Sequence, residues 1–288
     1  MDTQNLGAFL AVAEGRSFSK AAERLHLSQP AISKRIAALE AQLGTALFDR
    51  VGRRIGLTDA GRTLLPYARR VLEDVEDGRR ALSRLSGAVG GRLSIGTSHH
   101  IGLHRLPPVL RAYTQRYPDV DLDIQFMDSE DACEAVLRGE LELGVVTLPT
   151  QPLPHLQTRL VWPDPLAVVV APGHPLMALR HPGLADLAAH PAVLPDERTY
   201  THRIVRTALE AHGVAPRIRL ATNYLETLKM LVAIGLGWSV LPRSMVDASI
   251  REVRIPELVL RRDLGAVWHR RRTRSAAATA LLDELGTA

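Results

Sequence analysis

Residues 28–44 of the chain read SQPAISKRIAALEAQLG, and this pattern predicts a short helix with two contrasting faces. Ser28 can cap the unpaired amides of the first turn, Pro30 suits that turn because it has no N–H, and Gly44 ends the helix. Successive residues turn by about 100°, so four apolar side chains share an inward face. They are Ile32, Ile36, Leu39 and Leu43.

The outward face of this helix is small, polar and cationic, which suits a close approach to base edges in a DNA groove. The candidate DNA-contacting residues on it are Ser28, Gln29, Pro30, Ser33 and Lys34. An ordinary amphipathic helix with a solvated face is the alternative, and the neighbouring segments favour the first interpretation.

A compact helix at residues 18–25 precedes this one, and His26, Leu27 and Ser28 form the turn between them. Two short helices joined by so tight a turn predict a helix-turn-helix. Residues 49–58 then predict a hairpin with a basic tip, which would act as a wing. Its cations can reach DNA phosphates or a minor groove, although a solvated loop is the alternative. These cations are Arg50, Arg53 and Arg54.

At this point the sequence resembles the LysR-type transcriptional regulators. The matching residues extend from Phe9 to Gly61, and they include SFSKAA at 17–22, LSQPAIS at 27–33, LFDR at 47–50 and LTDAG at 57–61. The resemblance implies a winged helix-turn-helix whose base contacts come from Gln29, Pro30, Ser33 and Lys34. Lys34 stands where many members have arginine, and lysine cannot make the same forked contact to guanine, so the base preference there is expected to be softer.

The segment after the wing predicts one long helix, from Thr58 or Asp59 to Arg84. Apolar or small residues recur in it at alternating steps of four and three, as in a coiled coil. We call them the heptad stripe: Leu64, Ala68, Val71, Val75, Gly78, Leu82 and Leu85. So narrow a stripe is most simply buried against a second copy, which predicts a homodimer; packing on its own core is the alternative. Residues 86–91, SGAVGG, predict a hinge.

From Arg92 the pattern changes to alternating strands and helices, which indicates an α/β sheet. Strands are expected at 92–97, 120–127, 141–147, 166–171, 192–194, 218–221, 238–241 and 264–269, and helices at 106–117, 129–138, 201–212, 224–234 and 275–285. The family resemblance continues through residues 139–144, 172–176 and 232–242. It implies an effector domain like the periplasmic binding proteins, with two α/β lobes, two crossing strands and a ligand cleft.

The predicted fold is therefore an α/β multidomain protein in four parts. A winged helix-turn-helix occupies residues 1–58, and a dimerising linker helix and hinge occupy residues 59–91. Effector-domain lobe 1 comprises residues 92–161 plus 267–288, and lobe 2 comprises residues 162–266.

Polar side chains cluster at strand ends and helix starts, where open α/β sheets bind anions. Thr97 and Ser98 follow the first strand, Thr147 ends the third, and Thr199 and Thr201 open a helix. Asn223 and Glu226 resemble a capping box at another helix start. Their convergence predicts a site for a small carboxylate or oxyanion, whereas hydroxyls that cap their own helices are the alternative. The candidate effector residues are Thr97, Ser98, His99, His100, Thr147, Thr199, Thr201 and Asn223.

The loop from Thr97 to His100 resembles that of the cysteine-biosynthesis regulators in this family, although His100 and Ile101 depart from their pattern. His100 and His104 are one helical turn apart, which raises a metal hypothesis. An imidazole that bonds an acidic effector and makes binding depend on pH is the favoured alternative, and we assign no metal and no cofactor from the sequence.

Composition sets further bounds on the chain of 288 residues. It is 46% hydrophobic, with 36 basic against 31 acidic residues and a net charge of +5, which permits nucleic-acid binding without requiring it. The single cysteine, Cys133, excludes an internal disulfide and a multi-cysteine zinc site, and we expect it in the core. The start of the chain does not resemble a signal peptide and no run is long enough to span a bilayer, so we expect a cytoplasmic protein with no membrane partner.

Together these patterns predict a transcriptional regulator, not an enzyme, in which a small metabolite closes the cleft. The predicted partners are double-stranded promoter DNA, the effector and further copies of the chain, as a dimer or, from the resemblance, a tetramer; RNA polymerase is another candidate. A nucleoid protein that bends DNA without an effector is one alternative. A hydrolase using Ser98 with His99 or His100 is another, although the chain lacks a Gly-x-Ser-x-Gly elbow, a Walker loop and a dinucleotide fingerprint.

Overall fold

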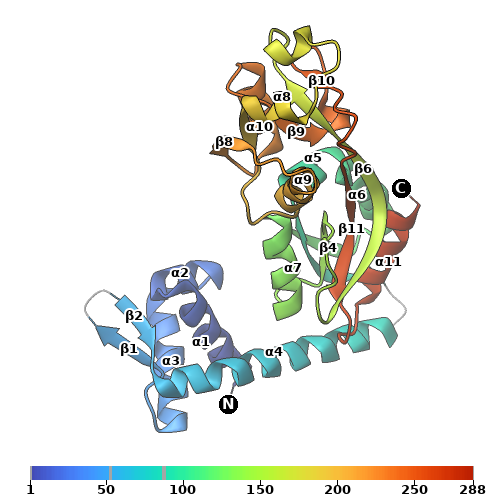
Figure 1. Ribbon diagram of the computed structural model, residues 1–288. Helices are drawn as coiled ribbons and strands as arrows, with labels where there is room; N and C mark the ends of the chain where they lie inside the picture. Colours follow the sequence, from blue (N-terminus) through green and yellow to red (C-terminus); the bar gives the residue numbers. More distant parts are fainter. Residues whose placement is uncertain (1, 52–53, 86–88, 288) are drawn as a thin grey trace. The chain divides into compact units, whose positions relative to one another are not determined.

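The computed structural model describes residues 2–51, 54–85 and 89–287 (Figure 1). Two compact units divide the chain, Met1–Leu82 and Ser83–Ala288. No helix within the described ranges combines the length and the apolar character that a bilayer crossing needs.

The first unit is a helix-turn-helix with a hairpin and a long helix. Its elements are α1 (Thr3–Gly15), α2 (Phe18–Arg24), α3 (Gln29–Leu43), β1 (Phe48–Val51), β2 (Arg54–Leu57) and α4 (Asp59–Leu85). The side chain of Ser17 caps α2 and that of Ser28 caps α3, each accepting a backbone N–H at 3.3 Å. Between these helices His26 adopts the left-handed conformation, which turns the chain sharply. The predicted fold of this unit is confirmed.

The core of the first unit gathers one face of each helix. Its largest members come from α1, α2 and α3, and the hairpin adds an anchor just after α3. They are Leu6, Phe9, Val12, Phe18, Ile32, Ile36, Leu39, Leu47 and Phe48. Leu43, which the helical period places inward, is instead 37% exposed, because the last turn of α3 extends past this core.

Helix α4 divides the heptad stripe into two parts. Ala68 is buried in the core of the first unit and Leu64 is half-buried against it, so the prediction that these two lie in a dimer seam needs correction. They pack on their own chain because α4 starts next to α1 and the hairpin. Val71, Val75 and Leu82 are exposed, and the side chain of Leu85 lies outside the description. Ser86, Gly87 and Ala88 of the expected hinge also lie outside the described residues.

In its described residues, the second unit alternates strands and helices around a seven-stranded mixed sheet, and two further strands form a separate parallel sheet. In chain order its first elements are β3 (Gly91–Thr97), α5 (His99–His104), α6 (Leu106–Arg116), β4 (Val120–Phe126), α7 (Ser129–Arg138), β5 (Leu143–Thr147) and β6 (Leu156–Val170). Then follow η1 (Pro175–Ala178), α8 (Leu184–Ala189), β7 (Pro191–Leu194), α9 (Tyr200–Glu210), β8 (Arg217–Ala221), α10 (Leu225–Ala233), β9 (Ser239–Pro242), η2 (Arg243–Met245), β10 (Arg251–Val253), β11 (Arg261–His269) and α11 (Ala276–Gly286).

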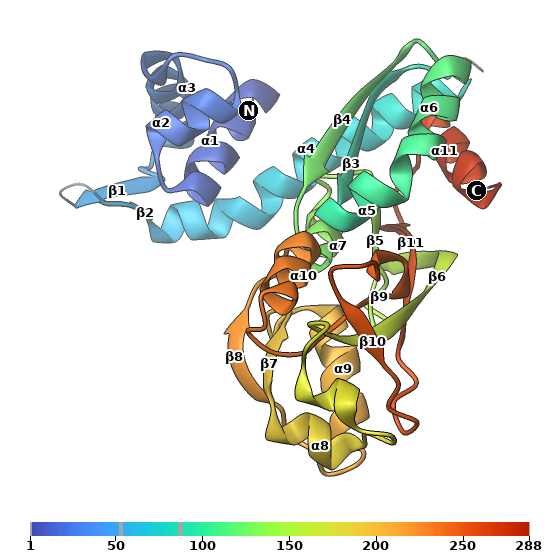
Figure 2. The ribbon, with the colours of Figure 1, turned by 90° about the horizontal axis from the view of Figure 1, so that it is seen from above.

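Two lobes share this sheet, as Figure 2 shows. Lobe 1 holds β3, β4 and β5 with helices α5, α6, α7 and α11; lobe 2 holds β7, β8 and β9 with helices α8, α9 and α10. The strand order is β10-β6-β11-β5-β3-β4, and β9 also pairs with β6. Residues 156–165 of β6 pair with β11 except at Val161, where the register shifts, and residues 166–170 pair with β9 or β10. The same strand therefore serves the cores of both lobes, and the predicted two-lobed fold is confirmed.

Several elements differ from the sequence expectation. Strand β6 begins at Leu156 rather than Leu166, and β11 begins at Arg261 rather than Leu264. Pro163 and Pro165 argue against a strand, but they lie where β6 pairs on one side only, with β11, so no ladder bond is lost there. Helices α5 and α8 and strand β10 were not expected, because each is too short for a clear period.

Candidate functional site

Helix α3 presents the predicted DNA-contacting face to solvent. Ser28, Gln29, Pro30 and Lys34 are exposed and Ser33 is half-buried, whereas Ile32, Ile36 and Leu39 are buried on the other side. Contacts outside that face hold the helix in place. Arg35 Nη2 donates to Gln4 Oε1 at 2.9 Å, and Glu40 Oε1 accepts the Leu47 N–H at 2.7 Å. The polar face is therefore fixed by its neighbours while its own donors point to solvent.

The hairpin has the pairing expected of a wing. Phe48 pairs with Leu57, and Val51 pairs with Arg54 across the tip. Arg50 and Arg54 lie in the strands, although the structure does not describe their side chains, and Arg53 lies outside the described residues. In the first turn of α4, Gly61 allows a close approach to the segment before the hairpin, because a Cβ there would lie 2.2 Å from the Leu47 carbonyl oxygen.

A cavity of about 390 Å³ lies between the lobes of the second unit. The structure brings seven of the eight predicted effector residues to its lining: Ser98, His99, His100, Thr147, Thr199, Thr201 and Asn223. These residues come from α5 and the end of β5 in lobe 1, and from α9 and the segment before α10 in lobe 2. Side chains more than a hundred positions apart therefore face one space.

Thr97 is the predicted residue that the structure does not place there. Its side chain is fully buried and its hydroxyl donates to the Val145 carbonyl oxygen at 2.8 Å. Thr97 ends β3 beside Val145 of β5 and bonds to it, whereas the next residue, Ser98, lines the cavity. The prediction of an effector contact for Thr97 was wrong for that reason.

Two of the lining residues have other roles than the sequence suggested. The Thr199 hydroxyl caps α9, accepting the His202 N–H at 3.1 Å and donating to the Asp196 carbonyl oxygen at 2.7 Å. The predicted capping box of Asn223 and Glu226 does not form, because α10 begins later, at Leu225. Asn223 instead connects the lobes: its Nδ2 donates to Asp128 Oδ2 at 2.6 Å, and its Oδ1 accepts the Asp196 N–H at 2.9 Å.

The sequence analysis missed the guanidinium group of the cavity, Arg262 on β11. Its guanidinium is 5% exposed, and Nε donates to Asp164 Oδ2 at 2.7 Å. A longer contact of 3.4 Å joins Nη1 to the Thr201 hydroxyl. Nη2 is buried and has no hydrogen-bond partner among the described residues. Burial lowers the pKa of Arg262, but a guanidinium keeps its charge in a protein, so a cationic donor remains available in the cavity.

Acidic groups also line the cavity. Asp128 and Glu130 lie at the start of α7, and Glu130 accepts the Tyr200 N–H across the lobes. Burial raises the pKa of Glu130 above its usual range. The cavity thus offers a cationic donor at Arg262 and carboxylate acceptors at α7.

The histidines of α5 have different surroundings. His99 lies between the rings of Phe126 and Tyr224, with both centroids at 5.4 Å. His100 is buried, and neither ring nitrogen has a hydrogen-bond partner in the described part of the chain. Burial, with the nearby charge of Arg262, lowers the pKa of His100 to about 4, so its ring is neutral at physiological pH. Because His100 bonds no hydroxyl, the Ser98–His100 pair that a hydrolase would need is not formed.

Two family models match the chain. Residues 3–62 match "Bacterial regulatory helix-turn-helix protein, lysR family", and residues 86–288 match "LysR substrate binding domain". The chain belongs to the LysR family. It is a DNA-binding transcriptional regulator of the LysR type and not an enzyme.

Curated relatives of this LysR-family regulator agree with the assignment. The chain is 67% identical over 108 residues to an HTH-type transcriptional regulator in the ibpB-leuC intergenic region of Azotobacter vinelandii, which covers 38% of this chain and 75% of that protein. It is also 30% identical over 283 residues to the protein named "Probable RuBisCO transcriptional regulator" of Cyanidioschyzon merolae, covering 95% of this chain and 93% of that protein.

Solved structures of full-length family members have the same architecture as this LysR-type chain. A full-length OxyR variant from Pseudomonas aeruginosa superposes with a TM-score of 0.70 at 27% identity, covering 99% of this chain and 94% of that one. Full-length CbnR complexed with its target DNA gives a TM-score of 0.64 at 25% identity, covering 99% of both chains. LysR regulators bind promoter DNA and small-molecule effectors and form oligomers.

A sequence signal did exist for the missed arginine of this LysR-family regulator. Arg262 lies two residues before Leu264, and strand alternation puts both on the buried face of β11. A buried cation needs a counter-ion, but its partner Asp164 is 98 positions away on β6. The three charged residues at 261–263 by themselves favour a solvated loop, and for this reason the sequence did not indicate Arg262 as a site residue.

Proposed function

We propose that this LysR-family regulator senses a small carboxylate or oxyanion in the cavity between its lobes. The observation that carries the proposal is the buried Arg262, whose Nη2 has no hydrogen-bond partner among the described residues. A buried cationic donor left unpaired is costly, and an anion that accepts from it removes that cost.

The surroundings of Arg262 support an oxygen-bearing anion. Ser98, Thr147 and Thr201 line the same cavity, and each hydroxyl can donate to an oxygen of the ligand. The cavity volume of about 390 Å³ fits a metabolite of a few carbon atoms. Asp128 and Glu130 then select the other end of the ligand, which carries a hydrogen-bond donor such as a hydroxyl or an ammonium group.

The proposed response follows from where these groups lie. Ser98, Asp128 and Glu130 belong to lobe 1, whereas Thr201 and Asn223 belong to lobe 2. A ligand that touches both lobes binds the closed arrangement better than the open one, and only this difference in affinity can shift the balance between them. Closure then alters how the oligomer sits on DNA.

The DNA-binding part of the proposal rests on the exposed face of α3. Gln29, Pro30, Ser33 and Lys34 read bases, Ser28 lies at the edge of the face, and Arg50, Arg53 and Arg54 of the wing contact phosphates. The exposed residues Val71, Val75 and Leu82 of α4 pair with a second copy, and assembly to a tetramer and contact with RNA polymerase are further proposals.

The decisive experiment is a thermal-shift screen of the full chain against small carboxylates, hydroxy acids, amino acids and sulfur oxyanions. The test variant Thr201→Val removes one cavity hydroxyl while keeping the shape of the side chain. The control Thr158→Val makes the same change on the exposed part of β6. At a hundred times its Kd a ligand stabilises the protein by about 2.7 kcal/mol.

We expect a ligand that stabilises the wild type and Thr158→Val equally and stabilises Thr201→Val much less. A hit that is indifferent to Thr201→Val contradicts the assignment of this cavity. Indifference of the wild type to every compound favours a regulator that acts on DNA without an effector.

A further inference from the structure

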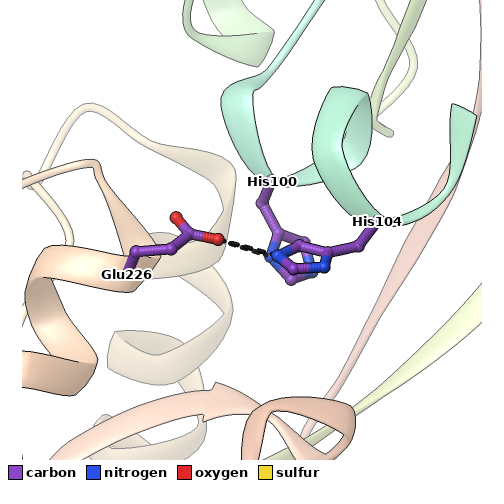
Figure 3. A group of neighbouring side chains, drawn as sticks. All are labelled: His100, His104 and Glu226. Atoms are coloured by element: carbon purple, nitrogen blue, oxygen red, sulfur yellow. Dashed lines mark hydrogen bonds and ion pairs between the residues drawn. The ribbon is translucent and has the colours of Figure 1, made fainter. Parts of the chain in front are cut away.

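Two histidines and a glutamate face one another across the lobes, as Figure 3 shows. His100 and His104 lie one turn apart on α5 of lobe 1, and Glu226 lies in the first turn of α10 of lobe 2. The Nε2 atom of His104 is 2.9 Å from Glu226 Oε1, and His100 Nδ1 is 3.6 Å from the same oxygen. One potential ligand atom from each residue lies within 4.8 Å of the other two.

We propose that His100, His104 and Glu226 bind a divalent transition-metal ion of the zinc class. Two imidazole nitrogens and one carboxylate oxygen are a ligand set that zinc accepts in proteins, with water or another ligand in the fourth position. The proposal goes beyond the sensing of an organic effector and does not depend on it.

The strongest support is the state of His100. Its side chain is 3% exposed, yet neither ring nitrogen has a hydrogen-bond partner within the described residues. Buried polar atoms almost always find a partner, and leaving one without costs about 1–3 kcal/mol. A metal ion on Nδ1 therefore gives this buried ring the partner that it lacks.

The distances also suit a metal ion. In a tetrahedral zinc site with bonds of about 2.0–2.1 Å, neighbouring ligand atoms are about 3.3 Å apart. The contacts of 2.9 and 3.6 Å to Glu226 Oε1 lie on either side of that value. Small rotations of His104 and Glu226 complete the geometry, and both side chains are free to make them because they are 49% and 42% exposed. The same exposure gives the ion a route from solvent.

The charges around the cluster must also be compatible with a divalent ion. Arg105 follows His104 in the sequence and Arg262 lines the same cavity as His100, and both pair with the buried carboxylate of Asp164. The carboxylate of Glu226 contributes an oxygen ligand, and its Oε1 lies 2.9 Å from His104 Nε2 and 3.6 Å from His100 Nδ1.

A bound ion would join the two lobes. Because α5 belongs to lobe 1 and α10 to lobe 2, a metal ion held by both opposes their separation. His100 also lines the effector cavity, so the ion and the effector would be neighbours that favour the same closed arrangement.

The test uses the full chain without a polyhistidine tag, stripped of metal by a chelator. Zn²⁺ affinity is measured by competition with a chromophoric chelator, and Co²⁺ is added separately because tetrahedral Co²⁺ has an intense visible absorption. The variants are His104→Gln and Glu226→Gln, both at half-exposed positions where the fold tolerates change. The matched control is His212→Gln, which removes an exposed histidine elsewhere in lobe 2.

We expect one tight Zn²⁺ site per chain and a tetrahedral Co²⁺ spectrum in the wild type and in His212→Gln. Each cluster variant should lose about tenfold or more in Zn²⁺ affinity and lose the Co²⁺ spectrum. Unchanged affinity in both cluster variants, or an equal loss in His212→Gln, overturns the proposal. Neither outcome bears on the Thr201→Val test, so failure of the metal site and failure of the effector site are distinguishable.

Discussion

Replacing Asp164 by asparagine tests the buried ion pair beside the effector cavity. Asp164 is 1% exposed and accepts from Arg262 Nε at 2.7 Å and from Arg105 Nη2 at 3.1 Å. Asparagine has nearly the same shape, so the packing is retained while the negative charge is removed. Arg262 keeps its positive charge in the folded protein and loses its buried counter-ion.

The size of the effect follows from this burial. Removing one partner of a buried ion pair costs about 3–5 kcal/mol of unfolding free energy, because an uncompensated charge is left inside. For a unit of the size of Ser83–Ala288, each kcal/mol lowers Tm by roughly 2–4 °C. We therefore expect Asp164→Asn to lower the Tm of this unit by roughly 6–20 °C.

Tryptophan fluorescence during thermal and urea unfolding of the full chain provides the assay. The chain has three tryptophans, Trp162, Trp238 and Trp268, and all of them lie in the second unit. The signal therefore follows this unit alone. The control Glu252→Gln breaks the ion pair between Arg243 and Glu252, which has the same length of 2.7 Å but side chains that are 58% and 33% exposed.

The two variants break ion pairs of the same length that differ in burial, so a difference in their unfolding free energies reports the effect of burial. Glu252→Gln should cost less than about 1 kcal/mol, as exposed ion pairs usually do. If Asp164→Asn costs no more than Glu252→Gln under the same conditions, the argument that Arg262 depends on a buried counter-ion is refuted.

Three further predictions concern other parts of the chain. Lys34→Ala should weaken binding to the cognate operator by about 1–3 kcal/mol if Lys34 contacts a base, whereas an equal loss on random DNA identifies a phosphate contact. Gly61→Ala should destabilise the first unit by about 1–3 kcal/mol in a circular-dichroism melt, because the added Cβ would overlap the Leu47 carbonyl oxygen. The control Gly7→Ala should stabilise the first unit, because nothing lies within 4 Å of the added Cβ and alanine favours a helix more than glycine does. Equal effects of the two changes would contradict this prediction. Burial raises the pKa of Cys133 from 9.0 to about 12, so at pH 8 the thiolate is roughly a thousandfold scarcer in the folded protein than in the unfolded chain. A disulfide reagent should therefore react with Cys133 only as the protein unfolds. Rapid labelling of the folded protein would disprove the burial of this thiol.

The first unit was predictable because its signals are local. Ser17, Ser28 and Gly44 cap helices through contacts within a few residues, and the apolar period of α3 is complete in fifteen residues. The contacts of the heptad stripe could not be predicted from local sequence alone. Period alone cannot tell that Leu64 and Ala68 meet their own chain while Val71 and Val75 do not, because this depends on where the other helices lie.

Most residues that line the cavity could be predicted from the sequence, but its buried cation, Arg262, could not. Seven of the eight predicted residues reach it because strand ends and helix starts of an α/β sheet gather at one edge. Arg262 was missed because its counter-ion comes from a distant strand. The contacts of Asn223 were also missed, because Asp196 is 27 positions away and Asp128 lies in the other lobe. Long-range pairing of polar groups leaves no periodic trace in the sequence.

Strand β6 also limits how this chain can evolve. Nine of its first ten residues pair with β11, with a register shift at Val161, and its last five residues pair with β9 or β10. Inserting or deleting one residue in a strand sends every later side chain to the opposite face of the sheet. A one-residue change near Leu156 would therefore exchange the inner and outer faces in lobe 2 as well as in lobe 1. Length changes should accumulate in the loops around β6 and be absent from the strand, so the two lobes must diverge by substitution and not by independent resizing.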